Sequence, residues 1–80
     1  MATGRDYWTG TRLRVLRALL GLTREMLVRV ALGSTVLPES VARWERWESA
    51  PRQASADRLT EFATARGVDL EALDRLVAGV

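Results

Sequence analysis

The sequence predicts an all-α fold of five short helices, and three observations carry this prediction. Apolar residues recur at spacings of three and four along most of the chain, which is the period of a helix with one buried face. No run of alternating polar and apolar residues is long enough to indicate a strand. Eighty residues, 48% of them hydrophobic, provide one modest core. We therefore expect a single domain over residues 9–80, preceded by an N-terminal arm over residues 1–8 that Tyr7 and Trp8 pin to it.

Two helices are predicted before the middle of the chain. Thr9 or Thr11 is suited to cap the first helix, and Gly21 is suited to end it. The apolar residues of this helix share one face: Leu13, Leu16 and Leu20. The second helix is capped by Thr23 and closed by Gly33. Its inward residues are expected to be Leu27, Val30 and Ala31.

A third helix is predicted to begin at Pro38, after a turn over residues 34–37. Proline is suited to the first position of a helix and disfavours helix in the residue before it. One stripe of this helix is apolar: Val41, Trp44 and Trp47. Another face carries charged residues: Glu39, Arg43 and Arg46. The charged face is therefore free to contact another molecule.

The last two helices are predicted after a loop over residues 49–54. Ser55 is a suitable cap for the fourth helix, and Gly67 for its end. The expected buried residues of this helix are Leu59, Phe62 and Ala63. Asp69 caps the fifth helix, which carries a long apolar stripe: Leu70, Leu73, Leu76 and Val77. Because a four-helix core cannot easily bury this whole stripe, we expect it to contact a second copy of the chain.

The composition excludes most enzyme classes. The chain has no cysteine and no histidine, which excludes disulfides, cysteine and histidine zinc sites, a thiol nucleophile and a histidine base. No catalytic constellation can be assembled, so we expect no enzyme activity, cofactor, metal or small-molecule ligand. No apolar run approaches the roughly 20 residues that cross a membrane, so we expect a cytoplasmic protein without a membrane partner.

The net charge of +2 is unevenly distributed. Residues 1–47 carry eight arginines against four acidic residues, a net +4, whereas residues 48–80 carry four arginines against six acidic residues, a net −2. All twelve basic residues are arginine, whose planar fork is suited to phosphate and guanine. A GC-rich genome would also favour arginine over lysine, so this bias alone does not indicate nucleic-acid binding.

Three segments follow one another in an order typical of a known family. Residues 10–27, GTRLRVLRALLGLTREML, are similar to the pattern G-x-R-[LI]-R-x-L-R-x-x-x-G-L-[ST]-Q-E-x-L. Residues 40–45, SVARWE, followed by Pro51, are similar to S-x-[IV]-S-x-W-E and its downstream proline. Residues 58–73, RLTEFATARGVDLEAL, look like the closing helices of the same family. The chain thus resembles the helix-turn-helix domains of lambda-type phage repressors and Cro proteins, also called the XRE family.

The chain departs from the family pattern around the second and third helices. Between Leu27 and Val41 it is about three residues longer, with one additional residue in the second helix and the others in the turn. Val28 stands where a small alanine is usual, and Trp47 stands where a glycine commonly ends the third helix. The resemblance therefore implies a lambda-repressor-like domain whose turn before the third helix is lengthened.

The resemblance implies that the third helix reads base edges in the major groove while the second crosses the backbone. It assigns four residues to base-reading positions: Pro38, Glu39, Ser40 and Arg43. Arg43 is suited to bidentate contact with guanine O6 and N7, and Glu39 to accept a hydrogen bond from cytosine N4. The alternative for Glu39 and Arg43 is an exposed i, i+4 ion pair that stabilises the helix by a few tenths of a kcal/mol.

Phosphate contacts are expected mainly at the start of the second helix, where unpaired backbone amides favour an anion. Thr23 and Arg24 lie there, and the family commonly has a backbone-contacting glutamine where this chain has Arg24. Arg46, and Ser34 and Thr35 in the lengthened turn, are further candidates. The alternative is an ordinary helix cap followed by a solvated arginine.

Arg17 and Glu45 match two family positions that pair, which implies an ion pair that orients the third helix against the first. The alternative is two unrelated surface charges. Among the tryptophans, Trp44 is expected in the core. Trp8 and Trp47 either cover the apolar surface of residues 18–20 or form part of a dimer contact.

These observations predict a sequence-specific DNA-binding transcriptional regulator, most simply a repressor, that is nucleoid-associated when bound to DNA. The expected partners are double-stranded DNA with two-fold symmetry and a second copy of the chain. The alternative is a helical adaptor or antitoxin-like domain that has the same fold and binds a protein. Salt dependence separates the two functions, because DNA binding releases counterions and an apolar protein interface does not.

Overall fold

The computed structural model describes residues 4–33 and 35–79, and within these ranges the regular structure is entirely helical, which confirms the predicted all-α fold. None of the helices in these ranges is long and apolar enough to cross a bilayer. The elements in chain order are η1 (Arg5–Trp8), α1 (Gly10–Leu20), α2 (Arg24–Leu27), η2 (Val28–Leu32), α3 (Pro38–Glu45), α4 (Gln53–Ala65) and α5 (Leu70–Ala78).

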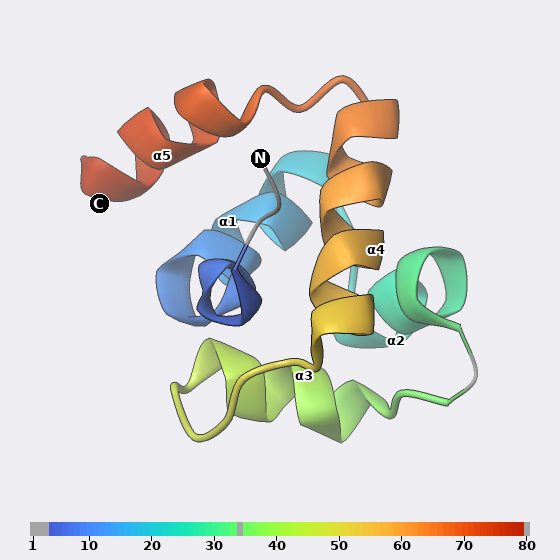
Figure 1. Ribbon diagram of the computed structural model, residues 1–80. Coiled ribbons are helices and arrows are strands. Elements are labelled where there is room, and N and C mark those ends of the chain that lie inside the picture. The colour runs from blue at the N-terminus through green and yellow to red at the C-terminus, as the bar shows by residue number, and fades with distance from the viewer. Residues whose placement is uncertain (1–3, 34, 80) are drawn as a thin grey trace.

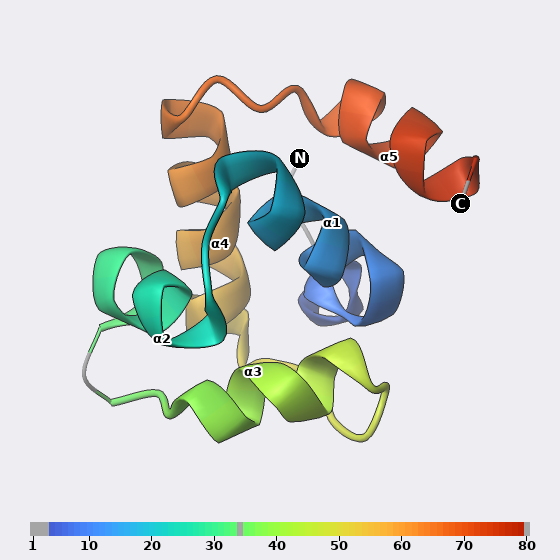
Figure 2. The same cartoon turned by 180° about the vertical axis from the view of Figure 1, so that it is seen from behind.

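The helices enclose one core, with α3 and α5 at opposite ends of the molecule. Figure 1 shows α4 standing beside α1, with α3 across one end of this pair and α5 across the other, and the view from behind in Figure 2 agrees. Helix α1 contacts both α3 and α5, whereas α4 contacts η1 and η2. The largest buried side chains of the core are Trp8, Leu13, Leu16, Leu27, Leu32, Leu59, Leu73 and Val41.

The N-terminal segment is part of the domain over its described length. Residues 5–8 form the 3-10 helix η1, and the Trp8 side chain is fully buried, with its Nε1 donating to Thr60 Oγ1 at 2.9 Å. The Arg5 guanidinium donates to the carbonyl of Pro51 at 3.1 Å. The sequence predicted an arm pinned by Tyr7 and Trp8; the pinning is confirmed, but residues 5–8 are not a separate arm. Residues 1–3 of the predicted arm lie outside the described residues.

Tyr7 joins this segment to α1 and α5. Its hydroxyl donates to Asp74 Oδ1 at 2.9 Å, and the Arg12 guanidinium lies over its ring at 4.1 Å from the centroid. Arg12 also pairs with Asp74 at 3.0 Å. Burial, and then the hydrogen bond to Asp74, raise the pKa of Tyr7 to about 12. The three side chains therefore hold η1, α1 and α5 together at one point of the surface.

The first helix begins without the predicted side-chain cap. Thr9 occupies the N-cap position, but its hydroxyl donates to the carbonyl of Asp6 at 2.6 Å instead of accepting from the helix, and Thr11 lies within α1. The Thr9 hydroxyl therefore bonds to η1 and does not form the predicted cap of α1. At the other end, Gly21 adopts the left-handed conformation, as predicted, with φ of 66°.

The second helix changes from α to π geometry at Val28. The Thr23 hydroxyl accepts from the amide of Met26 at 3.1 Å, which confirms the predicted cap. Over η2 the amide of Gly33 bonds to the carbonyl of Val28 at 2.7 Å, five residues earlier. A π turn accommodates one additional residue, which agrees with the residue that the sequence analysis added to this helix.

The wider turn changes which residues face the core. After Leu27 the next fully buried side chain is Leu32, five residues later, while Val30 is 46% exposed and Ala31 is half-buried. The prediction that Val30 faces inward is therefore wrong, because it assumed the regular α period through the π turn.

Helix α4 begins three residues earlier than predicted. Its first residue is Gln53 and its N-cap is Arg52, which makes no side-chain cap, so Ser55 lies inside the helix. At its end Gly67 has φ of 80°, and the amide of Val68 bonds to the carbonyl of Ala63 at 2.9 Å, which confirms the predicted glycine termination. Asp69 then caps α5, accepting from the amide of Glu71 at 3.1 Å, as predicted.

Candidate nucleic-acid interface

The exposed face of α3 is a charged ridge formed by Glu39, Arg43 and Arg46. Glu39 and Arg43 pair at 3.6 Å with side chains that are 72% and 53% exposed, so the pair is weak and both groups can turn to another partner. Arg46 bonds instead to Glu48 at 2.6 Å, and this hydrogen bond lowers the pKa of Glu48. The opposite face of α3 buries Val41 and Trp44, as the sequence predicted.

The two ends of α3 are fixed by different features. Pro38 occupies the first helical position, as expected. At the other end the amide of Glu48 bonds to the carbonyl of Arg43 at 2.9 Å, and the amide of Trp47 bonds to the carbonyl of Trp44 at 3.2 Å. These two bonds form a Schellman motif, in which the residue after the helix adopts a left-handed conformation. Here that residue is Trp47, with φ of 62°, where glycine is commonly found.

The Trp47 indole lies against the backbone of Gly10 at the start of α1. A Cβ atom built on Gly10 would overlap the indole, so no residue with a side chain fits there while the ring stays in place. The indole is nevertheless 68% exposed. Trp47 therefore does not extend the apolar stripe of α3, because the left-handed turn carries it away from the core.

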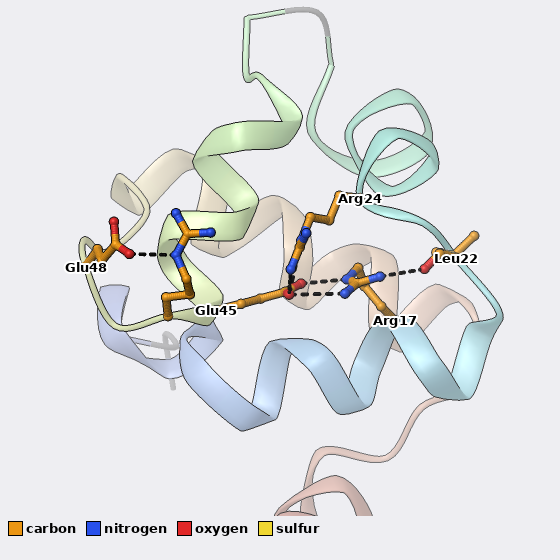
Figure 3. A network of polar contacts seen from close by, with 6 residues as sticks. Arg17, Leu22, Arg24, Glu45 and Glu48 are labelled. Atoms are coloured by element: carbon orange, nitrogen blue, oxygen red, sulfur yellow. Dashed lines mark hydrogen bonds and ion pairs between the residues drawn. The ribbon is translucent and has the colours of Figure 1, made fainter.

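Arg17 and Glu45 form the predicted ion pair. Arg17 Nε and Nη2 donate to the two carboxylate oxygens of Glu45 at 2.5 and 3.1 Å, and the Glu45 side chain is only 1% exposed. Arg17 Nη1 also donates to the carbonyl of Leu22 at 3.0 Å (Figure 3). The fork of Arg17 thus links α1 to the end of α3 and to the segment before α2.

Arg24 binds the same carboxylate, which the sequence did not predict. Its Nε and Nη2 donate to Glu45 Oε1 at 3.2 and 3.0 Å, and Figure 3 shows both guanidinium groups converging on Glu45. Arg24 was expected to face a phosphate, but in this structure its side chain turns toward the buried carboxylate and remains 42% exposed. One buried negative charge therefore holds two positive charges, which leaves a net +1 in the cluster.

Two hollows lie on either side of the ridge. The first, of about 470 Å³, lies between the starts of α2 and α3 and is lined by two arginines and two carboxylates: Arg17, Arg24, Glu25 and Glu39. We call it the mixed hollow. Thr23 and Pro38 also line it. Since its charged groups balance, the mixed hollow offers little net attraction to an anion.

The second hollow, of about 480 Å³, lies between α3 and the start of α4, and we call it the basic hollow. Its charged lining residues are three arginines, Arg43, Arg52 and Arg58, and no carboxylate is found among them. Four hydroxyl side chains also line it: Thr35, Ser40, Ser49 and Ser55. Arg58 is held in place by a bond from Nη1 to the carbonyl of Leu32 at 2.9 Å. This chemistry is suited to an anion.

The structure distributes the predicted contact residues over these features. Of the predicted base-reading residues, Pro38 and Glu39 line the mixed hollow, whereas Ser40 and Arg43 line the basic hollow. The predicted phosphate contacts divide as well: Thr23 and Arg24 belong to the mixed hollow, Thr35 to the basic hollow, and Arg46 to neither. Ser34 lies outside the described residues.

Arg52 and Arg58 were not predicted from the sequence as members of the site. Arg52 directly precedes α4, so an arginine at a helix start beside the third helix was a possible signal. The predicted cap at Ser55 placed that start three residues too late and left Arg52 in a loop. The position of Arg58 depends on its bond to a carbonyl of η2, which no local sequence pattern shows.

Most of the α5 stripe that was predicted to contact a second copy is buried within the chain itself. Leu73 is 1% exposed and belongs to the core of its own chain, so it is not available to a second copy without unfolding. Leu70 and Val77 are partly buried and pack against that core. Leu76 is 50% exposed and remains the one residue of the four that is open to a partner. Contact between α1 and α5 accounts for the burial of the stripe.

Comparisons of the chain with protein-family models, with curated proteins and with solved structures give no match. The likeness to lambda-type repressors therefore depends on the residues quoted above, and the function is inferred from the ridge and the two hollows.

Proposed function

We propose that this chain is a sequence-specific DNA-binding transcriptional regulator, acting as a repressor, that places α3 in the major groove of a two-fold symmetric operator. The observation that carries the proposal is the basic hollow beside the charged ridge of α3. Three arginines surround it without a carboxylate, in a chain whose net charge is only +2. Such a concentration of one charge beside an exposed helix is the electrostatic pattern of a nucleic-acid contact.

The shape of this surface suits a duplex. The major groove is about 12 Å wide and admits one helix, and a phosphate strand runs along each of its edges. With the ridge of α3 in the groove, each hollow faces one strand. Arg52 and Arg58 can neutralise a phosphate on the side of the basic hollow. Helix α4 begins beside Arg52 and has no side-chain cap, so its first amides can donate to the same phosphate.

The charged ridge of α3 contacts the base edges in this proposal. Arg43 can donate to guanine O6 and N7 in a bidentate contact, and Glu39 can accept from cytosine N4. Both groups must leave their mutual ion pair to do so. At 3.6 Å and with both side chains exposed, that pair stabilises the free protein by only a few tenths of a kcal/mol. Breaking the pair therefore costs little free energy when Arg43 and Glu39 contact bases.

The contacts of Arg24 argue against a phosphate at this side chain. Its guanidinium already bonds to Glu45, and Glu25 and Glu39 lie nearby in the mixed hollow. A phosphate there would compete with three carboxylates. We therefore assign the main phosphate contact to the basic hollow, with the amides at the Thr23 cap as the weaker contact on the other strand.

We further propose that the binding unit is a homodimer. One domain of this size makes few base contacts, and specific affinity usually requires two half-sites about 34 Å apart. The exposed side chain of Leu76 lies on α5, at the end of the molecule opposite α3 (Figure 1). Pairing through α5 would therefore leave both ridges open to DNA.

A second candidate function is binding of a protein through the same region. Met26 in α2 and Val30 in η2 are apolar residues that are 42% and 46% exposed. A helical adaptor or antitoxin-like domain would use exposed residues of this kind. It would leave the three arginines of the basic hollow without a role.

Salt dependence of binding distinguishes the two functions. Duplexes selected from random DNA by the protein would be titrated by fluorescence anisotropy at several salt concentrations, for the wild type and for Arg52→Ala. Removing an arginine that neutralises one phosphate in each half-site should reduce the slope of log affinity against log salt by about 0.9 per half-site, or roughly 1.8 for the dimer. The matched control is Arg66→Ala, which removes the same charge from the exposed C-terminal end of α4, away from α3 and from the α5 face proposed for the dimer. It should leave the slope nearly unchanged.

Three results would count against the proposal. Failure to enrich any sequence would exclude specific binding. Equal slopes for Arg52→Ala and wild type would show that the basic hollow does not contact phosphate. A single chain bound tightly to one half-site, measured by sedimentation, would exclude the dimer.

A further inference from the structure

Leu37 is a large apolar residue whose side chain neither caps a helix nor packs in the core. It is the N-cap of α3, and its side chain is 64% exposed. A leucine cannot accept a hydrogen bond from the first amides of a helix, whereas Ser, Thr, Asn and Asp can and are preferred there. The second and fifth helices follow this preference with Thr23 and Asp69. Neither capping nor burial therefore accounts for leucine at the start of α3.

The neighbours of Leu37 place it within the candidate interface. The two residues before it, Thr35 and Val36, line the basic hollow, and the two after it, Pro38 and Glu39, line the mixed hollow. Leu37 therefore lies between the hollows, at the N-terminal end of the ridge. In the proposed complex this end of α3 is the part that approaches the base edges.

The major groove offers one apolar group to such a side chain. Base edges there present nitrogen and oxygen donors and acceptors, and the only apolar feature is the 5-methyl group of thymine. Glu39 and Arg43 are suited to the polar groups, and Leu37 is not. Resting on the proposed function, we propose that Leu37 contacts the methyl group of a thymine and so selects a T·A pair at one position of each half-site.

The test removes only the methyl group from the DNA. In the duplex that the wild-type protein selects, each thymine is replaced in turn by uracil, and affinity is measured by anisotropy at one salt concentration. At one position per half-site the replacement should weaken wild-type binding by about fourfold, the factor expected for burial of one methyl-sized group. Leu37→Ala should bind the thymine duplex more weakly than wild type and should no longer distinguish uracil from thymine.

Leu19→Ala is the matched control. Leu19 is 51% exposed, and it follows Arg17 by two residues, so it lies on the side of α1 away from the contact with α3. It should keep the wild-type discrimination against uracil. Circular dichroism of Leu37→Ala should match that of the wild type, because the leucine contributes little buried surface.

The outcomes separate this inference from the function on which it rests. If no duplex is selected, both are overturned. If the protein selects a duplex but uracil is tolerated everywhere, if no thymine is selected, or if Leu37→Ala keeps full discrimination, DNA binding stands and the contact with Leu37 is overturned.

Discussion

Replacing Glu45 by glutamine should be the most destabilising conservative change among the charged residues of this domain. The substitution keeps the size of the side chain but puts an uncharged amide among four guanidinium nitrogens of Arg17 and Arg24, which lie at 2.5 to 3.2 Å from the carboxylate. At 1% exposure, water cannot replace the missing charge. Leaving a buried ion pair without one partner costs about 3 to 5 kcal/mol. Domains of this size have a free energy of unfolding of about 4 to 12 kcal/mol, so the loss is a large fraction of the total.

Arg17 and Arg24 should contribute unequally to the free energy of unfolding. Arg17 is 19% exposed and also bonds to the carbonyl of Leu22, so Arg17→Ala should cost about 2 to 3 kcal/mol; Arg24 remains as a partner for Glu45 and limits the cost. Arg24 is 42% exposed, and its removal leaves the bidentate pair intact, so Arg24→Ala should cost about 1 kcal/mol or less. The double change of Arg17 and Glu45 should cost less than the sum of the single changes by about 1 to 2 kcal/mol.

Urea unfolding followed by tryptophan fluorescence measures these differences, because Trp8 and Trp44 are buried and respond to loss of the core. Glu61→Gln is the matched control: it makes the same chemical change on an exposed position of α4 and should change stability by less than about 0.5 kcal/mol. Additive effects of Arg17 and Glu45, each below about 1 kcal/mol, would refute the buried cluster.

Two further predictions concern the strained tryptophan and the single tyrosine. Trp47→Gly and Trp47→Ala both remove the indole, but only glycine relieves the left-handed backbone, so the glycine variant should be more stable by about 1 kcal/mol in urea unfolding; equal stabilities would show that the backbone is unstrained. Tyr7 has its pKa raised from 10.0 to about 12. The contribution of the neutral Tyr7 hydroxyl to the free energy of unfolding is therefore complete below pH 10 and is lost as the pH rises through 12. Absorbance titration should give a midpoint near 12 that falls only part of the way toward 10 in Asp74→Ala, because burial of the ring remains, and a wild-type midpoint of 10 would contradict both the burial and the hydrogen bond.

The sequence predicted those features that depend on local chemistry. Thr23 and Asp69 cap their helices, Pro38 begins α3, and Gly67 ends α4, because each depends on the conformation or hydrogen bonding of a few adjacent residues. The all-α fold followed from apolar spacing for the same reason. The prediction that Val30 faces the core was wrong because the π turn interrupts that spacing. A single sequence shows no sign of where a helix widens.

Features of the candidate site that depend on packing were harder to predict. The spacing of Glu39 and Arg43 placed both on one face of α3, as observed. The bond from Arg24 to Glu45 joins residues 21 positions apart, and nothing in either segment indicates it. The basic hollow likewise needs α4 to bring Arg52 and Arg58 beside Arg43. The Arg17 and Glu45 ion pair was predicted only because the two residues match paired positions in the family that the chain resembles. Their own spacing in the sequence does not indicate this long-range contact.

The ridge of α3 owes its position to contacts at both ends of α1. Near the C-terminal end of α1, Arg17 binds the Glu45 carboxylate, and at the N-terminal end the Trp47 indole lies against Gly10. Both contacts involve the last turn of α3 and the residues that end it, whereas Leu37 and Glu39 at its start are exposed. The helix is thus fixed at its last turn and along its buried face, while its charged face stays open to solvent. Rotation about the last turn alone would move the first turn the furthest, and the burial of Val41 and Ala42 between the two ends of the helix prevents that rotation.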